Sequence, residues 1–183
     1  MIHMREFEPH ELLPVAVVRC LAIVEYLGRS RSASLALSLQ KVAIFDSGLK
    51  NPKIARRLLT ELAPDKLTEL EFSPVLYPGE EEHGGPMNKL EVMKIASLLS
   101  RAELITLEPL DGTLILRPKS AEPILDVNRI PARWIATLKA FNVLASKSTP
   151  TLQGAVHREL KDGGEEYVFV NRETYSEGGN KRL

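Results

Sequence analysis

Cysteine is almost absent from this chain of 183 residues, which contains it only at position 20. A single cysteine excludes a disulfide framework and a zinc site built from several cysteines. It also suggests a reducing compartment, where thiols stay unpaired. Aromatic residues make up only 5% of the chain and include one tryptophan, which argues against a surface that stacks on nucleic-acid bases.

An excess of charge of either sign is also missing, because the chain has 24 basic and 24 acidic side chains. This balance excludes a strongly cationic nucleic-acid coat protein and a strongly acidic mimic, and it leaves a local patch open. Long hydrophobic runs are missing too. The longest apolar stretch, residues 12–27, is interrupted by Pro14, Arg19 and Glu25 and is shorter than the ~20 residues that cross a bilayer. With no signal-peptide core in the first ten residues, we expect a cytoplasmic protein that does not enter a membrane.

Apolar residues recur every three or four positions in the first third of the chain, which predicts three short helices. The first covers residues 12–27 and ends at Gly28, because glycine accepts the left-handed conformation of a helix C-cap. The third begins at Asn51-Pro52, since asparagine caps free amides and proline suits the first helical position. The second lies between them, ends near residues 46–48 and has an apolar face of Leu35, Leu39, Val42 and Phe45.

Proline, glycine and glutamate punctuate residues 64–87, which predicts a surface loop with one short extended piece at Phe72–Tyr77. Asn88 and Glu91 have the spacing of a capping box and open a helix over residues 88–102. Its predicted inward face consists of Leu90, Met93, Ala96 and Leu99.

Two runs rich in strand-forming residues, 103–108 and 113–117, are joined through Asp111-Gly112, a strong signal for a β-hairpin. A helix over 129–145 and another over about 149–160 follow, and Tyr167–Val170 reads as a small strand. The first of these helices has Trp134, Leu138 and Phe141 on one stripe, which we expect to close the core rather than face a partner. The predicted units are an N-terminal helical half (1–63), a loop (64–87), a helix with its hairpin (88–120), C-terminal helices (121–162) and a short strand with a polar tail (163–183).

The order helix, helix, helix, then a helix leading into a hairpin is that of a winged-helix domain. We therefore expect a mainly α fold with a β-hairpin, winged-helix-like within the α+β class, made of two small halves packed together. The hairpin would be the wing. A generic α+β bundle with one hairpin is the alternative.

Residue patterns that carry chemistry are not found in this sequence. Its four histidines lack metal-ligand spacing, no phosphate-binding glycine loop ends in Lys-Ser or Lys-Thr, and no serine sits in a Gly-x-Ser-x-Gly setting. Cys20 lies on the main apolar stripe of the first helix, which favours a core position over a nucleophile. We therefore predict no catalytic residue, no metal and no cofactor, and a protein that is not an enzyme.

Basic residues cluster in two places. Arg29, Arg31 and Lys41 surround the start of the second helix. The helix and hairpin carry the four candidates for contact with DNA phosphates: Lys89, Lys94, Arg101 and Arg117. The alternative is an ordinary solvated face, because glutamates and an aspartate accompany them. The helix before the hairpin has few side chains that read base edges, which argues against direct sequence-specific recognition. For a protein partner, Leu114 and Leu116 of the hairpin are the candidate contacts.

One segment carries a resemblance to a known family. Leu39-Gln40-Lys41-Val42-Ala43-Ile44-Phe45-Asp46, followed by Leu49-Lys50-Asn51-Pro52 and a leucine-rich helix, resembles the opening of middle-component proteins from bacterial ABC-three-component defence systems. That group includes the small subunit of Lamassu. The matching pattern is Leu-x-Lys-x-x-x-Phe-Asp before an Asn-Pro helix start, within residues 12–63. The likeness extends to about residue 118 by architecture.

This resemblance implies a non-catalytic accessory subunit that links an SMC-like ABC ATPase to an effector such as a nuclease in an antiviral defence complex. DNA contact would then occur as part of the assembled complex. No functional residue of the family transfers, because the matching positions have structural roles. The alternative function is a winged-helix DNA-binding transcriptional regulator.

Overall fold

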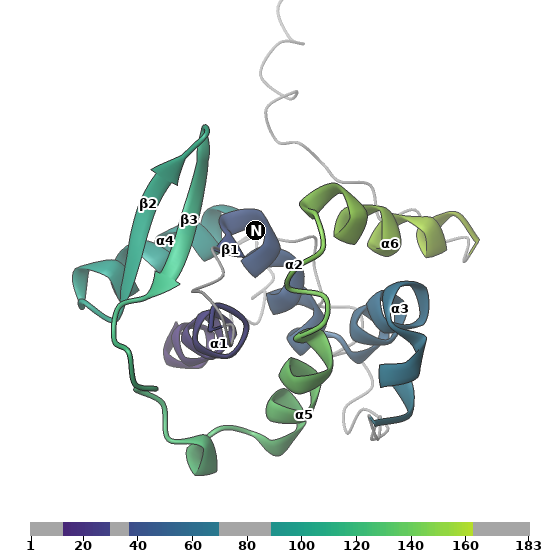
Figure 1. The fold of residues 1–183 in the computed structure, drawn as a ribbon, viewed down its shortest axis with the longest axis horizontal. Helices are drawn as coiled ribbons and strands as arrows, with labels where there is room; N and C mark the ends of the chain where they lie inside the picture. Colours follow the sequence, from purple (N-terminus) through teal and green to yellow (C-terminus); the bar gives the residue numbers. More distant parts are fainter. Residues whose placement is uncertain (1–12, 30–36, 70–88, 163–183) are drawn as a thin grey trace, which may run out of the picture.

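The computed structural model describes residues 13–29, 37–69 and 89–162 (Figure 1). The described elements are α1 (Leu13–Leu27), β1 (Leu37–Ser38), α2 (Leu39–Lys50), α3 (Pro52–Leu62), the 3-10 helix η1 (Pro64–Glu69), α4 (Lys89–Arg101), β2 (Ile105–Leu110), β3 (Thr113–Pro118), the 3-10 helix η2 (Val127–Arg129), α5 (Ala132–Phe141) and α6 (Thr149–Asp162). The described part is mainly helical with one small sheet, which confirms the coarser part of the fold prediction. The predicted pieces at Phe72–Tyr77 and Tyr167–Val170, and the cap at Asn88, lie outside the described residues.

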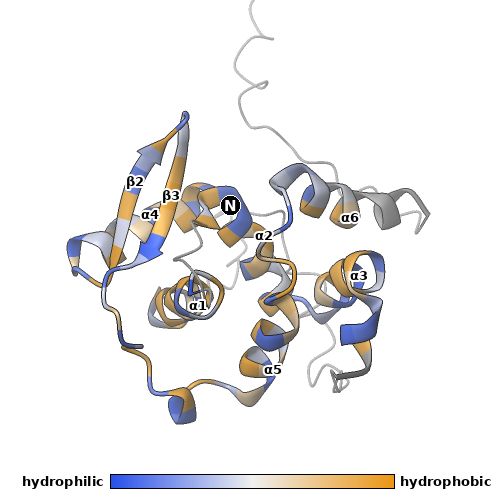
Figure 2. Cartoon of the chain, in the orientation of Figure 1, coloured by the Kyte–Doolittle hydropathy of each residue, from blue (hydrophilic) through white to orange (hydrophobic). Residues whose placement is uncertain are grey.

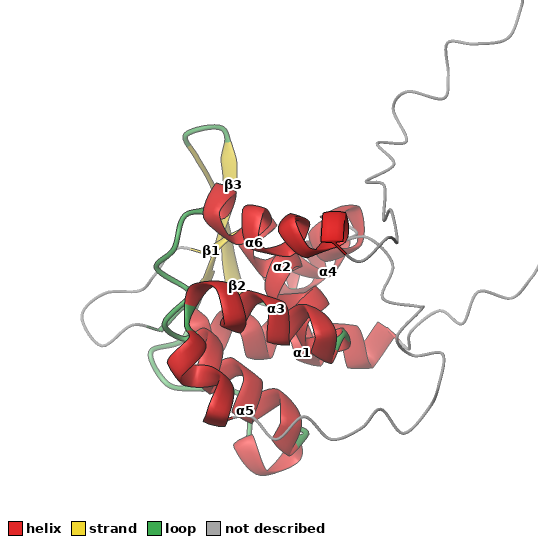
Figure 3. Cartoon of the chain, turned by 90° about the vertical axis from the view of Figure 1, so that its right-hand side faces the viewer, coloured by secondary structure: helices red, strands yellow, loops and turns green. Residues whose placement is uncertain are grey.

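The sheet is antiparallel, with the strand order β1-β3-β2. Leu116 of β3 lies opposite Leu37 of β1 on one side and Leu107 of β2 on the other. The hairpin turn is formed by Asp111 and Gly112, both at positive φ (48° and 73°), as the type I′ turn of a two-residue hairpin requires. The predicted hairpin is thus confirmed, with strands of 105–110 and 113–118. Its tip extends beyond the helices in two perpendicular views (Figures 1 and 3).

Three helices, α1, α2 and α4, contact one another and the sheet, whereas α3 packs between α2 and α6. Figure 2 shows α1 as largely hydrophobic in the middle of the fold. This agrees with the burial of the main apolar stripe of this helix, including Cys20 and Ile23. One hydrophobic cluster extends from Ala16 in α1 to Val156 in α6. Trp134, Leu138 and Phe141 of α5 are buried in it, so their predicted core position is confirmed.

Phe45 and Gly48 of α2 define the contact with α5. The rings of Phe45 and Phe141 lie with their centroids 5.4 Å apart. A Cβ atom added at Gly48 would lie 2.7 Å from the Phe141 ring. Glycine at this position therefore allows the two helices to approach closely, although it lowers helix propensity.

Several predicted helix ends are confirmed. The Asn51 side chain accepts from the Lys53 N–H at 2.9 Å and caps α3, with Pro52 as its first residue. The end of α1 at Leu27 also agrees, but its predicted cause is wrong. Gly28 is not in the left-handed conformation. A side chain there would instead meet the Val24 carbonyl oxygen at 2.4 Å and Pro118 Cδ at 3.2 Å.

The start and end of the second helix differ from the prediction. Leu37 and Ser38 form the short strand β1, and Ser38 then caps α2 by accepting from the Lys41 N–H at 3.2 Å. The helix continues through Gly48 to Lys50 and ends at Asn51, which is extended and also caps α3. Further on, the predicted helix over 129–145 is shorter, since Pro131 delays its start to Ala132 and a turn follows Phe141. The helix predicted from residue 149 is confirmed as α6.

Candidate functional site

The helix before the hairpin, α4, carries three of the four predicted DNA contacts, and its buried face agrees with the prediction only in part. Its buried residues are Val92, Ile95, Ala96 and Leu99. Leu90 and Met93, predicted to point inward, are 65% and 37% exposed. The prediction is confirmed for Ala96 and Leu99 and wrong for Leu90 and Met93. Apolar residues occur on more than one side of α4, and periodicity alone does not tell which of them meet the core.

The exposed side of α4 combines apolar and basic side chains. Residues three or four positions apart share one helix face. The exposed residues with this spacing are Leu90, Met93, Lys94, Leu98 and Arg101. We call this set the outer α4 face. Half-buried Glu91 borders it, three residues before Lys94, and Leu98 within it is 44% exposed.

The four predicted basic contacts do not form one cluster. Lys89, Lys94 and Arg101 are exposed on α4, whereas Arg117 is half-buried on β3 opposite Thr106. Lys89 and Arg101 are at the two ends of α4, about 18 Å apart at 1.5 Å per residue. Lys94 and Arg101 remain together on the outer α4 face.

The two hairpin leucines predicted to contact a partner have different surroundings. Leu116 is fully buried in the core, so its assignment to a partner surface is wrong. Leu114 is half-buried and packs against the same core. The reason is strand alternation, because residues 114 and 116 point to the same side of β3, where Leu37 and Leu107 pack beside them. The exposed hairpin leucine is Leu110 beside the turn, which the sequence analysis missed.

The α4 helix leads into the hairpin through a tight turn. Glu103 has a left-handed conformation, with φ of 61°. The Leu104 N–H donates to the Leu99 carbonyl at 3.0 Å, and the Glu103 N–H donates to that of Ser100 at 3.0 Å. These bonds satisfy the last carbonyls of α4 in the manner of a Schellman motif. The turn therefore fixes the direction of the hairpin relative to the outer α4 face.

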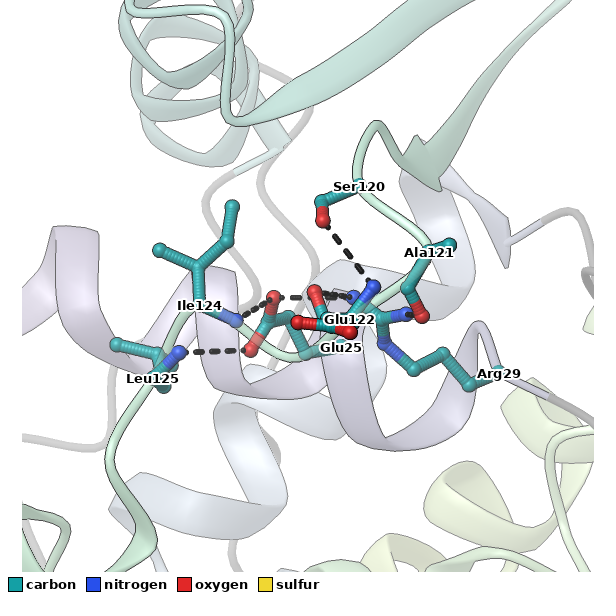
Figure 4. A network of polar contacts seen from close by, with 7 residues as sticks. All are labelled: Glu25, Arg29, Ser120, Ala121, Glu122, Ile124 and Leu125. Carbon is teal, nitrogen blue, oxygen red and sulfur yellow. Dashed lines mark hydrogen bonds and ion pairs between the residues drawn. The ribbon is translucent and has the colours of Figure 1, made fainter.

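A buried carboxylate on α1 holds the segment that follows the hairpin (Figure 4). Glu25 accepts from the backbone N–H groups of Ile124 at 2.9 Å and Leu125 at 3.1 Å. Its oxygen also pairs with Arg29, one helical turn later, at 3.2 Å. Arg29 in turn donates to the backbone carbonyls of Ala121 at 2.5 Å and Glu122 at 2.9 Å. These contacts attach the chain between β3 and α5 to α1.

Arg29 and Lys41, which belong to the first predicted basic group, therefore serve internal contacts. Lys41 donates its ammonium to the Ala145 carbonyl at 2.8 Å, where burial lowers the pKa of its side chain. Arg31, the third member of that group, lies outside the described residues.

A second internal ion pair lies between α1 and α2. Arg19 Nε and Asp46 Oδ1 are 2.5 Å apart, and Lys50 contacts the other oxygen of Asp46 at 3.1 Å. The Arg19 guanidinium also lies over the Trp134 ring, 5.6 Å from its centroid. Arg19, Asp46 and Trp134 thereby connect α1, α2 and α5, so the role of this ion pair is structural.

Cys20 is buried beside this pair, and its predicted core position is confirmed. Burial, and secondarily the Asp46 carboxylate, raise the pKa of the Cys20 thiol to about 12, although Arg19 acts in the opposite direction. The thiolate is the reactive form, so the folded protein should react poorly with thiol reagents.

We expect Ellman's reagent at pH 8 to label Cys20 about 100-fold more slowly in the native protein than in urea, because unfolding restores both access and an ordinary thiol pKa. The measurement is the rate of absorbance change with and without denaturant. Equal rates in the two conditions would mean that α1 opens readily or that Cys20 faces solvent.

Across residues 13–29, 37–69 and 89–162, no group of three histidine, cysteine, aspartate or glutamate side chains is placed to hold a metal ion. His3, His10 and His83 lie outside these ranges, and the side chain of His157 is not described. Within the same part of the chain, no helix has both the length and the apolar character to cross a membrane.

Comparisons with known proteins give no relative. No family model, no curated protein and no solved structure matches this chain.

Proposed function

We propose that this chain is a non-catalytic winged-helix accessory subunit that links an SMC-like ABC ATPase to an effector, such as a nuclease, in a bacterial defence complex. The observation that carries the proposal is the outer α4 face, which exposes three large apolar side chains on a helix otherwise anchored in the core. Exposed apolar residues gathered on one face mark a surface for contact with another protein. The resemblance of residues 12–63 to middle-component proteins gives the class of partner.

The winged-helix part of the proposal is supported by topology. In such domains, a short strand after the first helix joins the wing hairpin, and three helices form the core. Here β1 follows α1 and pairs with β3 of the hairpin, while α1, α2 and α4 contact one another. In this arrangement α4 is the helix before the wing, and α3 is an additional helix packed on the outside of the three.

The chemistry of α4 favours a protein over DNA as its first partner. A helix that reads the major groove offers donors and acceptors to base edges, most often arginine, asparagine or glutamine. On the outer α4 face, the leucines and Met93 offer neither, and Arg101 at its end is the one residue of that kind among the five. Lys94 and Arg101 would attract phosphates, so DNA contact fits a secondary role in the assembled complex.

The regulator remains the second candidate, because Lys89, Lys94 and Arg101 are all exposed on the helix before the hairpin. A regulator would bind one DNA sequence in preference to others without any ATPase. An accessory subunit would bind DNA within the assembled complex, with little sequence preference and with steep weakening by salt.

The test is co-purification of the tagged full chain with an SMC-like ABC ATPase encoded beside it, after co-expression. We expect the ATPase to be retained in a stable stoichiometric complex, because binding would remove the exposed apolar side chains of the outer α4 face from water. A matched tag on an unrelated protein of similar size is the control. Failure to retain the ATPase, together with tight, sequence-selective DNA binding by the isolated chain, would favour the regulator.

A further inference from the structure

We infer that residues 120–129, between β3 and α5, form a strap that opens from α1 as a separate unit while the rest of the fold stays intact. Glu25 and Arg29 of α1 form the latch that holds this strap closed (Figure 4). The inference concerns the conformation of the chain itself. It does not depend on the proposed function, because it applies whatever partner the protein binds.

The strap makes little apolar contact with the fold. Each of its residues is exposed except Leu125, which is half-buried and packs against the core. Ile124 and Val127 are 44% and 48% exposed, so these two large side chains remain about half in water. The regular structure of the strap is the single turn of η2 at its end. Segments with few buried apolar contacts open locally, at a lower free energy than global unfolding requires.

Polar contacts with α1 therefore provide most of the attachment. Glu25, which is 3% exposed, accepts two backbone N–H groups of the strap, and Arg29 donates to two of its backbone carbonyls. Hydrogen bonds to a charged group are about twice as strong as neutral ones. When the strap opens, water replaces these bonds at both charges, so opening costs only the difference between the two sets of bonds.

The two ends of the strap are held independently of the latch. Before the strap, the Lys119 N–H donates to the Leu104 carbonyl at 3.3 Å, beside the hairpin. After it, Ile130 is 7% exposed and belongs to the hydrophobic core. The strap can therefore leave α1 while both of its ends stay in place. The Arg19–Asp46 pair differs in this respect, because it joins two packed helices.

Opening changes what α1 presents to solvent. In the closed state the Glu25 carboxylate is buried, and Arg29 Nε is buried with no hydrogen-bond partner in the described part of the chain. In the open state, both charged groups are free to bind backbone groups other than those of the strap. The strap is thus a conformational switch, and the latch sets the equilibrium between its two states.

The first part of the experiment is amide hydrogen exchange of the wild-type full chain, followed by NMR at urea concentrations below the unfolding transition. Exchange at Ile124 and Leu125 should depend little on urea, because opening of the strap exposes little surface. Exchange at Ile23, in the buried part of α1, should accelerate steeply. If both strap amides show the urea dependence and the opening free energy of Ile23, the strap opens only with the whole fold, and the inference is wrong.

The second part tests the carboxylate with Glu25→Gln. The amide replaces one acceptor oxygen by an NH2 group, which cannot accept from a strap N–H. Exchange at Ile124 and Leu125 should accelerate about 10- to 100-fold, with its weak urea dependence unchanged. The matched control is Glu122→Gln, which makes the same change at an exposed strap residue that meets Arg29 through its backbone carbonyl. Its exchange rates should equal those of the wild type.

Arg29→Met tests the other half of the latch, since it removes the donors to the two strap carbonyls and keeps the apolar part of the side chain. It should accelerate exchange at the same two amides, and thermal melts show whether each variant folds. Wild-type exchange rates at Ile124 and Leu125 in both folded variants would overturn the latch. The urea series on the wild type decides whether the strap opens locally even if a variant does not fold.

Discussion

Phe45→Asp is expected to leave the chain unfolded at 25 °C. Phe45 is fully buried in α2, where its ring packs on Phe141 of α5. Loss of a buried phenylalanine alone costs about 3–5 kcal/mol. The new carboxylate would in addition lose its hydration in an apolar setting, so the total reaches much of the roughly 5–15 kcal/mol by which domains are stable. Far-UV circular dichroism during a thermal melt would show no cooperative transition.

Arg56→Ala is the control, because Arg56 is exposed on α3 and isolated changes at the surface alter stability by about 0.5 kcal/mol or less. Phe45→Leu is a second control, which keeps the site apolar and should give a folded protein with a lowered melting temperature. A melt of Phe45→Asp that coincides with that of the wild type would contradict the burial of this face of α2.

Features with a local cause could be predicted from the sequence. Asn51-Pro52 starts α3 because the cap and the first helical residue are neighbours in the chain. Asp111-Gly112 forms the hairpin turn because both positions must take positive φ, and glycine or aspartate adopts it more readily than most residues. In both cases the energy that decides the structure comes from a few adjacent residues.

Features that depend on contacts between residues distant in the chain could not be predicted from the sequence. The strand β1 has two residues and no pattern of its own, and it exists because Leu37 and Ser38 pair with β3. The orientation of α4 likewise depends on which of its two apolar stripes meets α1 and α2. Leu90 and Met93 were therefore assigned to the core, although they form the surface on which the functional proposal rests.

The contacts of Glu25 and Arg29 show the same limit for the site. Their partners are backbone groups 92 to 100 residues away in the chain. Because every residue has a backbone carbonyl and nearly every residue a backbone N–H, the residue types in the sequence do not identify these partners. The one local signal was the spacing of four between Glu25 and Arg29, which is that of a helical ion pair. It could indicate the pair, but not the segment that the pair holds.

Asp46→Ala is expected to lower the free energy of unfolding by about 3–5 kcal/mol. Arg19 is 2% exposed, and Asp46 is the carboxylate that compensates its charge at 2.5 Å. Without Asp46, the guanidinium keeps its desolvation cost and loses its closest counter-charge, and Lys50 adds a second positive charge nearby. Urea unfolding followed by tryptophan fluorescence is the measurement, since Trp134 lies against Arg19.

The double variant Arg19→Met/Asp46→Leu distinguishes loss of charge balance from loss of packing. It removes both charges and fills similar volume, so it should recover most of the stability lost in Asp46→Ala. Lys119→Ala serves as the exposed control, because its 3.2 Å contact with Glu103 is at the surface and should be worth at most about 1 kcal/mol. A double variant as unstable as Asp46→Ala would mean that the Arg19 side chain stabilises the junction of α1, α2 and α5 through its contacts rather than through its charge.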